Sequence, residues 1–150
     1  MCRLSLVFIS LILSQILYVN ETANGTLNLF GGITSEGIQN NYVNDAVKIL
    51  QTLGFKVRQT KNIVVVENKF KKNGFKRGYT NYFEIKGGDN ARSPGGIQGR
   101  TYYTIFVDEA AKCNQEYLKM AISRLSYKNS KFFMACNPEG NENHWFYKEY

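Results

Sequence analysis

The chain has 150 residues, of which 43% are apolar and 21% are charged, and this composition excludes an intrinsically disordered protein. A domain of this length buries roughly 70% of the surface that its unfolded chain exposes, so a hydrophobic core can form without disulfides. The formal net charge of +7 favours an anionic partner, with nucleic acid or nucleotide ahead of membrane lipid.

The three cysteines, Cys2, Cys113 and Cys136, are far apart in the sequence, and the chain has one histidine. Neither a disulfide scaffold nor a zinc site fits this number and spacing. The sequence therefore predicts reduced thiols, as in a cytosolic protein.

The first 26 residues begin with an apolar run, "MCRLSLVFISLILSQILY". Arg3 ahead of this run and the sequons at Asn20 and Asn24 would suit a secretory signal peptide. However, Ala23, the best small residue for cleavage, has no small residue two positions before it. The run is also too short to predict a membrane span. The other interpretation is a buried helix followed by a turn.

The next segment, "TLNLFGGIT", is apolar and contains two adjacent glycines near its end, which predicts a strand running into a loop. An amphipathic helix is expected to follow, with Ser35 as its N-cap and Gly54 as its stop. The residues of its expected buried face recur at helical spacing and are Ile38, Tyr42, Ala46, Ile49, Leu50 and Leu53.

Three strands are expected next, in "FKVRQT", "NIVVVENKF" and "YTNYFEIKGG", because these segments are rich in β-branched and aromatic residues. Asn73 and Gly74 form a turn pair that suits a hairpin between the last two. Five cations surround this turn: Lys69, Lys71, Lys72, Lys76 and Arg77. They either keep an exposed hairpin soluble and its edges unpaired, or contact the phosphate backbone of DNA.

A glycine-rich segment without periodicity, "GGDNARSPGGIQGR", predicts a loop. An apolar strand, "TYYTIFVDEA", follows it, then a helix from about residue 114 to 125 and a second apolar strand in "KFFMACNPEG". Strand, helix and strand with short connections predict a parallel βαβ unit. The predicted fold class is therefore α/β, with a parallel sheet, flanking helices and an inserted β-hairpin.

Asp108 and Glu109 end the first of these two strands, and Asn137 follows the second. Because the carboxyl ends of parallel strands lie at one edge of a sheet, the three side chains are expected to face one site. A magnesium-dependent nucleotide hydrolase needs one carboxylate for the metal and another to take a proton from water. Carboxylates also occur by chance where a buried strand meets water, so the pair alone leaves both interpretations open.

Five ordered motifs stand between residues 97 and 147: Ile97-Gln98-Gly99, Asp108-Glu109, Arg124-Leu125-Ser126, Ala135-Cys136-Asn137-Pro138 and His144-Trp145. With these motifs the chain resembles the ATPase domain of the large subunit of tailed-phage terminases, the motors that pump DNA into a procapsid. The resemblance covers residues 27 to 150 and is most specific over residues 97 to 147. It implies a P-loop NTPase-type sheet and a single, incomplete ATPase domain over residues 1–150, with 1–26 as an apolar helix and turn.

This resemblance implies ATP hydrolysis coupled to translocation of double-stranded DNA, with ATP and Mg²⁺ as cofactors. Asp108 would hold the Mg²⁺ through water, and Glu109 would be the catalytic base. Ala135, Cys136 and Asn137 would form the motif that couples hydrolysis to motion.

Further site residues are also implied. Gln98, Arg100 and Arg124 are candidate contacts to a phosphate or within the loop, whereas His144 is expected to be a structural or surface histidine. The implied partners are double-stranded DNA, the terminase small subunit and the portal of the procapsid. Homo-oligomers are expected only in the full-length motor, in the cytoplasm of a bacterial host and without a membrane.

The sequence departs from this family because it contains no G-x-x-x-x-G-K-[ST] string, the phosphate-binding P-loop. We expect the first helix to be the one that follows a P-loop, and the family's nuclease domain to lie outside these 150 residues. The chain alone is then expected to bind ATP weakly and to hydrolyse it barely. The alternatives are a non-catalytic DNA-binding remnant of the fold and a small secreted glycoprotein.

Overall fold

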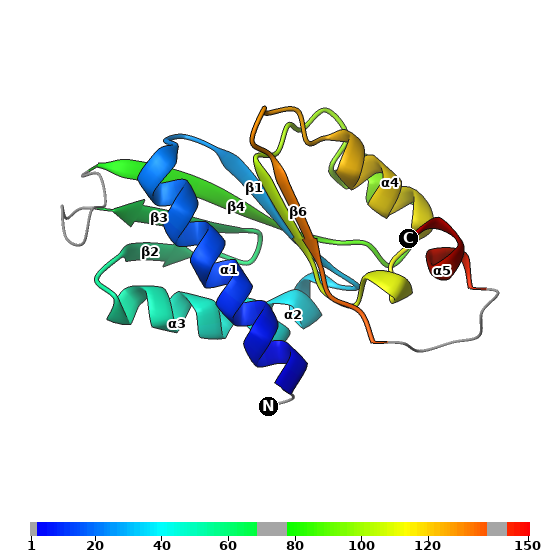
Figure 1. Ribbon diagram of the computed structural model, residues 1–150, viewed down its shortest axis with the longest axis horizontal. Coiled ribbons are helices and arrows are strands. Elements are labelled where there is room, and N and C mark those ends of the chain that lie inside the picture. Colours follow the sequence, from blue (N-terminus) through cyan, green and yellow to red (C-terminus); the bar gives the residue numbers. More distant parts are fainter. Residues whose placement is uncertain (1–2, 69–77, 138–143) are drawn as a thin grey trace.

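The computed structural model describes residues 3–68, 78–137 and 144–150 (Figure 1). The strands are β1 (Leu27–Gly32), β2 (Lys56–Gln59), β3 (Ile63–Asn68), β4 (Tyr79–Gly87), β5 (Thr104–Val107) and β6 (Lys131–Met134). The helices are α1 (Arg3–Thr22), α2 (Ser35–Ile38), α3 (Asn44–Thr52), α4 (Gln115–Ser123) and α5 (Trp145–Glu149). A π-turn, η1 (Gln39–Val43), joins α2 to α3, and the 3-10 turns are η2 (Ser93–Gly96) and η3 (Ala110–Lys112).

The six strands form one sheet in the order β2-β3-β4-β1-β5-β6. Strands β4, β1, β5 and β6 pair in parallel, whereas β3 is antiparallel to both of its neighbours. This arrangement confirms the predicted α/β class, and β5, α4 and β6 form the predicted parallel βαβ unit.

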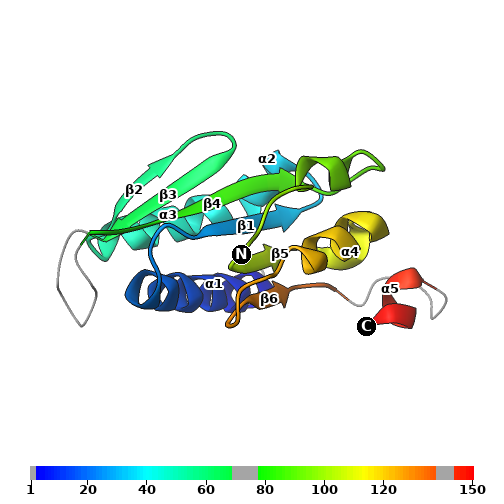
Figure 2. The same cartoon turned by 90° about the horizontal axis from the view of Figure 1, so that it is seen from above.

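Each face of the sheet has its own apolar cluster, because successive side chains of a strand point to opposite faces. Phe30 and Phe106 belong to the cluster beneath α1 and α3, and Leu29 and Ile105 belong to the cluster beneath α4. In Figure 2 the helices α4 and α5 lie toward the β5 and β6 end of the molecule, away from β2 and β3.

The first helix, α1, packs on the sheet, which confirms the prediction of a helix in this segment. Its buried side consists of Phe8, Ile9, Ile12, Ile16 and Val19, and its outer side exposes Leu6, Val7 and Leu11. Within the described residues, no helix is long and apolar enough to cross a membrane. The apolar run therefore supplies one layer of the fold.

Buried polar groups fasten α1 to the amino ends of the strands. The side chain of Gln15 donates to the hydroxyl of Thr104 (3.1 Å), and Asn81 donates to the side chain of Asn20 (3.2 Å). Asn28 accepts from the main-chain N–H of Thr104 (3.0 Å). Because these buried groups pair with each other, their desolvation is compensated.

Residues 35–52 form one helical segment that contains the π-turn η1. Its N-cap is Thr34, whose hydroxyl accepts from the main-chain N–H of Gly37 at 3.0 Å, so the prediction of Ser35 as the cap was wrong by one residue. Gly54, with a φ of +92°, follows the end of the segment as predicted.

The π-turn also changes which side chains the segment buries. A π-turn accommodates one more residue per turn than an α-helix, so the apolar face shifts along the sequence. Val43 and Val47 are buried, whereas Ile49 and Leu53, predicted on the buried face, are 39% and 55% exposed. The predicted face was therefore correct for Ile38, Tyr42, Ala46 and Leu50, and wrong for Ile49 and Leu53.

Helix α4 begins after Asn114, whose side chain accepts from the main-chain N–H groups of Glu116 and Tyr117. It ends at Ser123, two residues before the predicted end, because Leu125 already pairs with Tyr102 in an isolated parallel bridge.

Strands β3 and β4 form an antiparallel pair whose register includes Asn68 opposite Tyr79. This confirms the pairing predicted for the hairpin. The predicted turn pair, Asn73 and Gly74, lies outside the described residues, as do Lys69, Lys71, Lys72, Lys76 and Arg77.

Candidate functional site

The carboxyl ends of β5 and β6 are joined by two main-chain hydrogen bonds on either side of the carboxylate pair, Asp108 and Glu109, predicted as metal holder and catalytic base. The N–H of Ala135 donates to the carbonyl of Val107 (2.9 Å), and the N–H of Ala110 donates to the carbonyl of Ala135 (3.0 Å). The segment predicted to couple hydrolysis to motion is thus bonded directly to the segment that carries the carboxylates.

Asp108 lies where β5 meets the loop after β1, and its main-chain N–H donates to the carbonyl of Gly31 (3.1 Å). Its Oδ1 accepts from the main-chain N–H of Glu109 (3.0 Å), and its Oδ2 accepts from the side-chain amide of Asn41 (3.1 Å). Burial raises the pKa of Asp108, and this effect outweighs the two hydrogen bonds, which lower it.

Glu109 has a left-handed backbone, with φ of 50° and ψ of 42°, and is the one described non-glycine residue with a positive φ. Such a conformation is unfavourable for a residue with a Cβ, so the surrounding structure holds it there. It turns the chain out of β5 and into η3. Its carboxylate, 32% exposed, accepts from the ammonium of Lys112 (2.9 Å).

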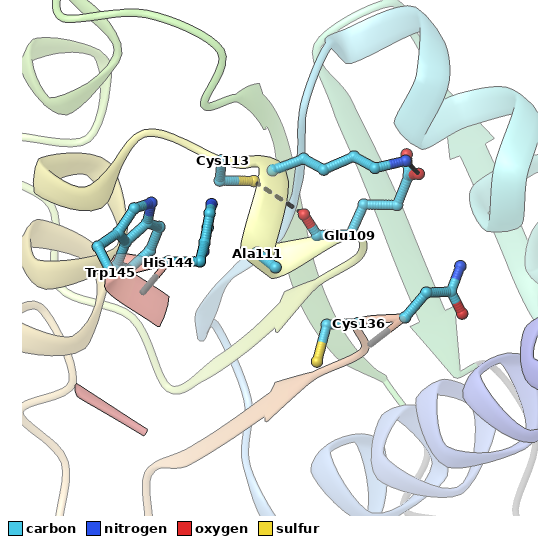
Figure 3. A pocket seen from close by; sticks show the side chains of 8 residues that line it. Glu109, Ala111, Cys113, Cys136, His144 and Trp145 are labelled. Atoms are coloured by element: carbon cyan, nitrogen blue, oxygen red, sulfur yellow. Dashed lines mark hydrogen bonds and ion pairs between the residues drawn. The ribbon is translucent and has the colours of Figure 1, made fainter. Parts of the chain in front are cut away.

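Two cavities meet at Glu109. One, of about 340 Å³, opens toward α4 and α5, and its lining includes Glu109, Cys113, Cys136, Asn137, His144 and Trp145 (Figure 3). The other, of about 240 Å³, lies toward α2, and its lining includes Thr34, Asn41, Asp108 and Glu109. The structure thus places Glu109 with Asn137 in one cavity and with Asp108 in the other.

The thiol of Cys113 points to the main-chain carbonyl of Glu109, with 3.8 Å between Sγ and O (Figure 3). Burial raises the pKa of Cys113 to about 12, and the nearby carboxylates add to this effect. The thiol therefore stays protonated at neutral pH and is a poor nucleophile. Cys113 and Cys136 are both free, as predicted.

His144 caps helix α5, because its Nδ1 accepts from the main-chain N–H of Phe146 (3.3 Å). This is the structural role that the sequence predicted. From the same helix, the hydroxyl of Tyr147 donates to the main-chain carbonyl of Asn137 (3.4 Å). Helix α5 thus holds the main chain of Asn137, whose side chain is exposed beside the larger cavity.

Gln98 and Arg100 lie in the loop between η2 and β5. The side chain of Gln98 is exposed. The guanidinium of Arg100 forms an ion pair with Glu84 of β4 (3.3 Å).

Arg124 lies at the other end of β5 from Asp108, where its main-chain carbonyl accepts from the N–H of Tyr102 (2.8 Å). Its Nε is buried and has no hydrogen-bond partner among the described residues. Arg100 and Arg124 therefore make these contacts away from the carboxylate pair.

Asp108 is the residue best placed to hold a magnesium ion. In nucleotide sites Mg²⁺ keeps several waters and uses one or two carboxylates together with phosphate oxygens. Each oxygen of Asp108 accepts one hydrogen bond and so retains acceptor capacity. No cluster of three His, Cys, Asp or Glu side chains suited to a metal exists within residues 3–68, 78–137 and 144–150. The donors thus fit a hydrated Mg²⁺ brought with a phosphate ligand.

Two polar neighbours of the pair, Asn41 and Lys112, were not predicted from the sequence. Asn41 reaches Asp108 from the π-turn, 67 residues away in sequence, and no pattern in the sequence indicates that contact. Lys112 follows Glu109 at a spacing of three residues, which was a readable signal for an ion pair in a helical turn.

Comparisons with known proteins place these features in context. No protein-family profile and no curated protein sequence matches the chain. Among solved structures, the large terminase of a thermophilic bacteriophage is 28% identical, with a TM-score of 0.82 over 95% of this chain and 34% of that one. The same terminase in complex with ATP-gamma-S gives a TM-score of 0.78 at 28% identity, over 95% of this chain and 32% of that one.

The large terminase ATPase domain of Thermus phage P74-26 is 18% identical, with a TM-score of 0.59 over 93% of this chain and 58% of that one. At that identity the likeness concerns the fold alone. The chain spans about a third of the thermophilic-phage terminase. These likenesses confirm the resemblance inferred from the sequence motifs: the chain has the fold of the ATPase domain of phage large terminases and resembles the thermophilic-phage terminase in sequence as well.

Proposed function

We propose that the chain is part of a phage DNA-packaging motor, in which hydrolysis of ATP drives double-stranded DNA into a procapsid. One observation carries this proposal. Asp108 and Glu109 end a buried strand beside Asn137 of the next parallel strand, in a fold shared with the thermophilic-phage terminase. That terminase has been solved in complex with ADP and with ATP-gamma-S.

Glu109 is the proposed general base. The left-handed turn directs its carboxylate to the junction of the two cavities, where a water and a phosphate have room. Lys112 occupies Oε1, so Oε2 is left to accept a proton from an attacking water.

Asp108 is the proposed holder of the hydrated Mg²⁺, which when bound supplies positive charge to the phosphate oxygens. The amide of Asn41 fixes the orientation of this carboxylate. Asn137 is the proposed link to motion, because Ala135, two residues before it, is bonded to Val107 and Ala110 on either side of the carboxylates.

The partners proposed on the resemblance are double-stranded DNA, the terminase small subunit and the portal, in a homo-oligomeric motor of the bacterial cytoplasm. Gln98, Arg100 and Arg124 are proposed, on the resemblance, for contacts to a phosphate or within the loop. Because the chain contains no P-loop string, it binds ATP weakly by itself and needs a P-loop segment for turnover.

Nuclear magnetic resonance of the purified chain during titration with Mg-ATP tests this proposal. We expect Mg-dependent shifts at Asp108, Glu109 and Asn137, lost in Asp108→Asn and kept in the matched surface variant Glu116→Gln. Unchanged resonances at saturating Mg-ATP would contradict the proposed site. Rapid ATP turnover that Glu109→Gln abolishes would contradict the proposed need for a P-loop segment.

The alternative is a DNA-binding remnant without ATPase activity, and the net charge of +7 favours it. A salt-dependent affinity for DNA together with no response to Mg-ATP would support this alternative.

A further inference from the structure

The outer side of helix α1 is apolar and exposed to solvent, and Figure 1 shows the helix lying across one face of the sheet. Leu6, Val7 and Leu11 are 52%, 63% and 44% exposed. No residue between Arg3 and Glu21 is charged. A helix on the surface of a soluble domain carries charged or polar residues on its outer face, and a contiguous apolar surface marks a site of interaction. The outer side of α1 is therefore suited to a partner.

The positions along this outer side suit a second helix. They recur at alternating spacings of four and three residues, and we call them the α1 seam: Arg3, Val7, Ser10, Ser14, Leu17 and Glu21. This is the spacing at which two helices pack side by side along their length. Val7, Ser10 and Ser14 are exposed, and Leu17 is half-buried.

The α1 seam is self-complementary about its midpoint, Ile12. When two copies of α1 lie antiparallel and are centred on this residue, Val7 of one copy faces Leu17 of the other. In the same arrangement Ser10 faces Ser14. Apolar side chains thus meet apolar ones and small side chains meet small ones. One surface that matches itself in this way is what a two-fold, isologous interface requires.

The charges at the ends of α1 favour this antiparallel orientation. A helix dipole is positive at the amino end and negative at the carboxyl end, so Arg3 and Glu21 each stand at the unfavourable end of their own helix. In the antiparallel pair, Arg3 of each copy stands beside Glu21 of the other. Each charge then lies next to its opposite and at the favourable end of the neighbouring helix.

The two serines at the centre can be buried at little cost. The hydroxyl of Ser10 already donates to the main-chain carbonyl of Leu6 (2.9 Å), so its hydrogen is satisfied within its own helix. Its oxygen is left to accept from Ser14 of the facing copy. Small side chains at the point of contact also allow the two helix axes to approach closely.

We propose that the outer face of α1 is a dimer interface, on which a second copy of this chain packs its own α1 in the antiparallel orientation. The proposal does not depend on the proposed packaging function. It differs from the sequence-based expectation that homo-oligomers form only in the full-length motor. A lipid surface fits this face less well, because helices that lie on membranes are rich in Lys and Arg, whereas α1 has no basic residue after Arg3.

Sedimentation velocity of the full chain over a range of concentrations tests the proposal and should show a monomer–dimer equilibrium. Leu11→Lys should raise the dissociation constant of the dimer at least about tenfold, because it places an unpaired charge in the interface. The matched variant Ile122→Lys carries the same charge at a 36% exposed position of α4, and should dimerise like the unaltered chain.

Charge reversal tests the orientation independently of Leu11. Glu21→Arg should weaken the dimer, because it places two cations side by side at each end of the helix pair. Arg3→Glu/Glu21→Arg exchanges the two charges and should restore dimerisation. In a parallel pair like charges would face each other before and after the exchange, so the double variant would restore nothing. Circular dichroism checks that each variant is folded.

Four results in sedimentation would overturn the proposal. They are a chain that stays monomeric at all concentrations, a dimer that Leu11→Lys and Glu21→Arg leave unchanged, equal weakening by Ile122→Lys, and a double reversal that does not restore the dimer. Monomers that bind vesicles of phosphatidylcholine and phosphatidylserine, and lose this binding in Leu11→Lys, would assign the face to lipid instead.

Discussion

The side-chain amide of Asn41 donates a 3.1 Å hydrogen bond to the carboxylate of Asp108 and so joins the π-turn η1 to the end of β5. This contact connects two elements on different sides of the smaller cavity. It also favours the ionised form of a carboxyl group whose pKa burial raises.

Replacing Asn41 by alanine should raise the pKa of Asp108 further, because a hydrogen bond to the ionised form is lost. The free energy of unfolding at neutral pH should fall by about 1 kcal/mol. A carboxyl resonance titration measures the first effect, and urea denaturation measures the second. The matched variant Asn40→Ala, in the same turn, should change neither, and an unchanged or lower pKa in Asn41→Ala would refute the contact.

The pH dependence of stability follows from the raised pKa of Asp108. The pKa of Asp108 in the folded state lies above its value in the unfolded chain. Asp108 therefore adds to the free energy of unfolding below the unfolded pKa, and this stabilisation is lost as the pH rises through the folded pKa. Asp108→Asn should therefore reduce the fall in stability over that pH window. If the free energy of unfolding fell more steeply with pH in this variant, the pKa of Asp108 would be lowered on folding, and the prediction would be wrong.

Glu109→Gly should be more stable than Glu109→Ala by about 1 kcal/mol, because glycine adopts the left-handed conformation without a clashing Cβ. Both variants remove the carboxylate and its ion pair with Lys112, so their difference isolates the backbone. Urea denaturation of the two proteins measures it. If the alanine variant proved the more stable, the left-handed turn would not be strained.

Gly88→Ala should destabilise the fold by about 2 kcal/mol, because a Cβ at this position would overlap the ring of Tyr117. The Tyr117 hydroxyl donates to the carbonyl of Lys86 (2.8 Å), which prevents the ring from moving aside freely. Gly95→Ala is the matched control, since a Cβ there meets no atom within 4 Å. Thermal unfolding of both variants provides the measurement, and equal melting temperatures would be evidence against the close packing.

Three buried tyrosines should make the protein unfold in alkali. Burial raises the pKa of Tyr42, Tyr102 and Tyr117, so these phenols stay protonated in the folded state while the unfolded chain ionises near 10.0. Above that pH each lowers the free energy of unfolding by about 1.4 kcal/mol per pH unit. Tyr102→Phe should make the fall of the free energy of unfolding with pH shallower by about 1.4 kcal/mol per pH unit. Phenolate absorbance that rises fully before unfolding would contradict this prediction.

The sequence predicted the fold well where the signal is periodic and local. The strand that ends at Asp108, the helix after Asn114 and the parallel partner that ends before Asn137 all have an apolar pattern bounded by polar or capping residues. The motifs shared with the terminase family lie at the ends of these same elements. The edge at which Asp108, Glu109 and Asn137 meet then follows from the parallel topology alone.

Contacts between distant segments could not be predicted in the same way. The π-turn has no sequence signature, so Ile49 and Leu53 were assigned to the wrong face and Asn41 was not recognised beside Asp108. Arg124 is different, because in the predicted parallel βαβ unit the helix returns the chain to the amino ends of the strands, so its separation from Asp108 could have been predicted.

Ala135 makes two main-chain hydrogen bonds to the segment 107–110, one through its N–H and one through its carbonyl. Any sliding of β6 along its axis must lengthen at least one of these bonds unless Asp108 and Glu109 move with it. Movement of β6 and movement of the carboxylate pair are therefore mechanically coupled while these bonds are intact. If both bonds persist, movement of β6 by a few ångströms must change the position of Glu109.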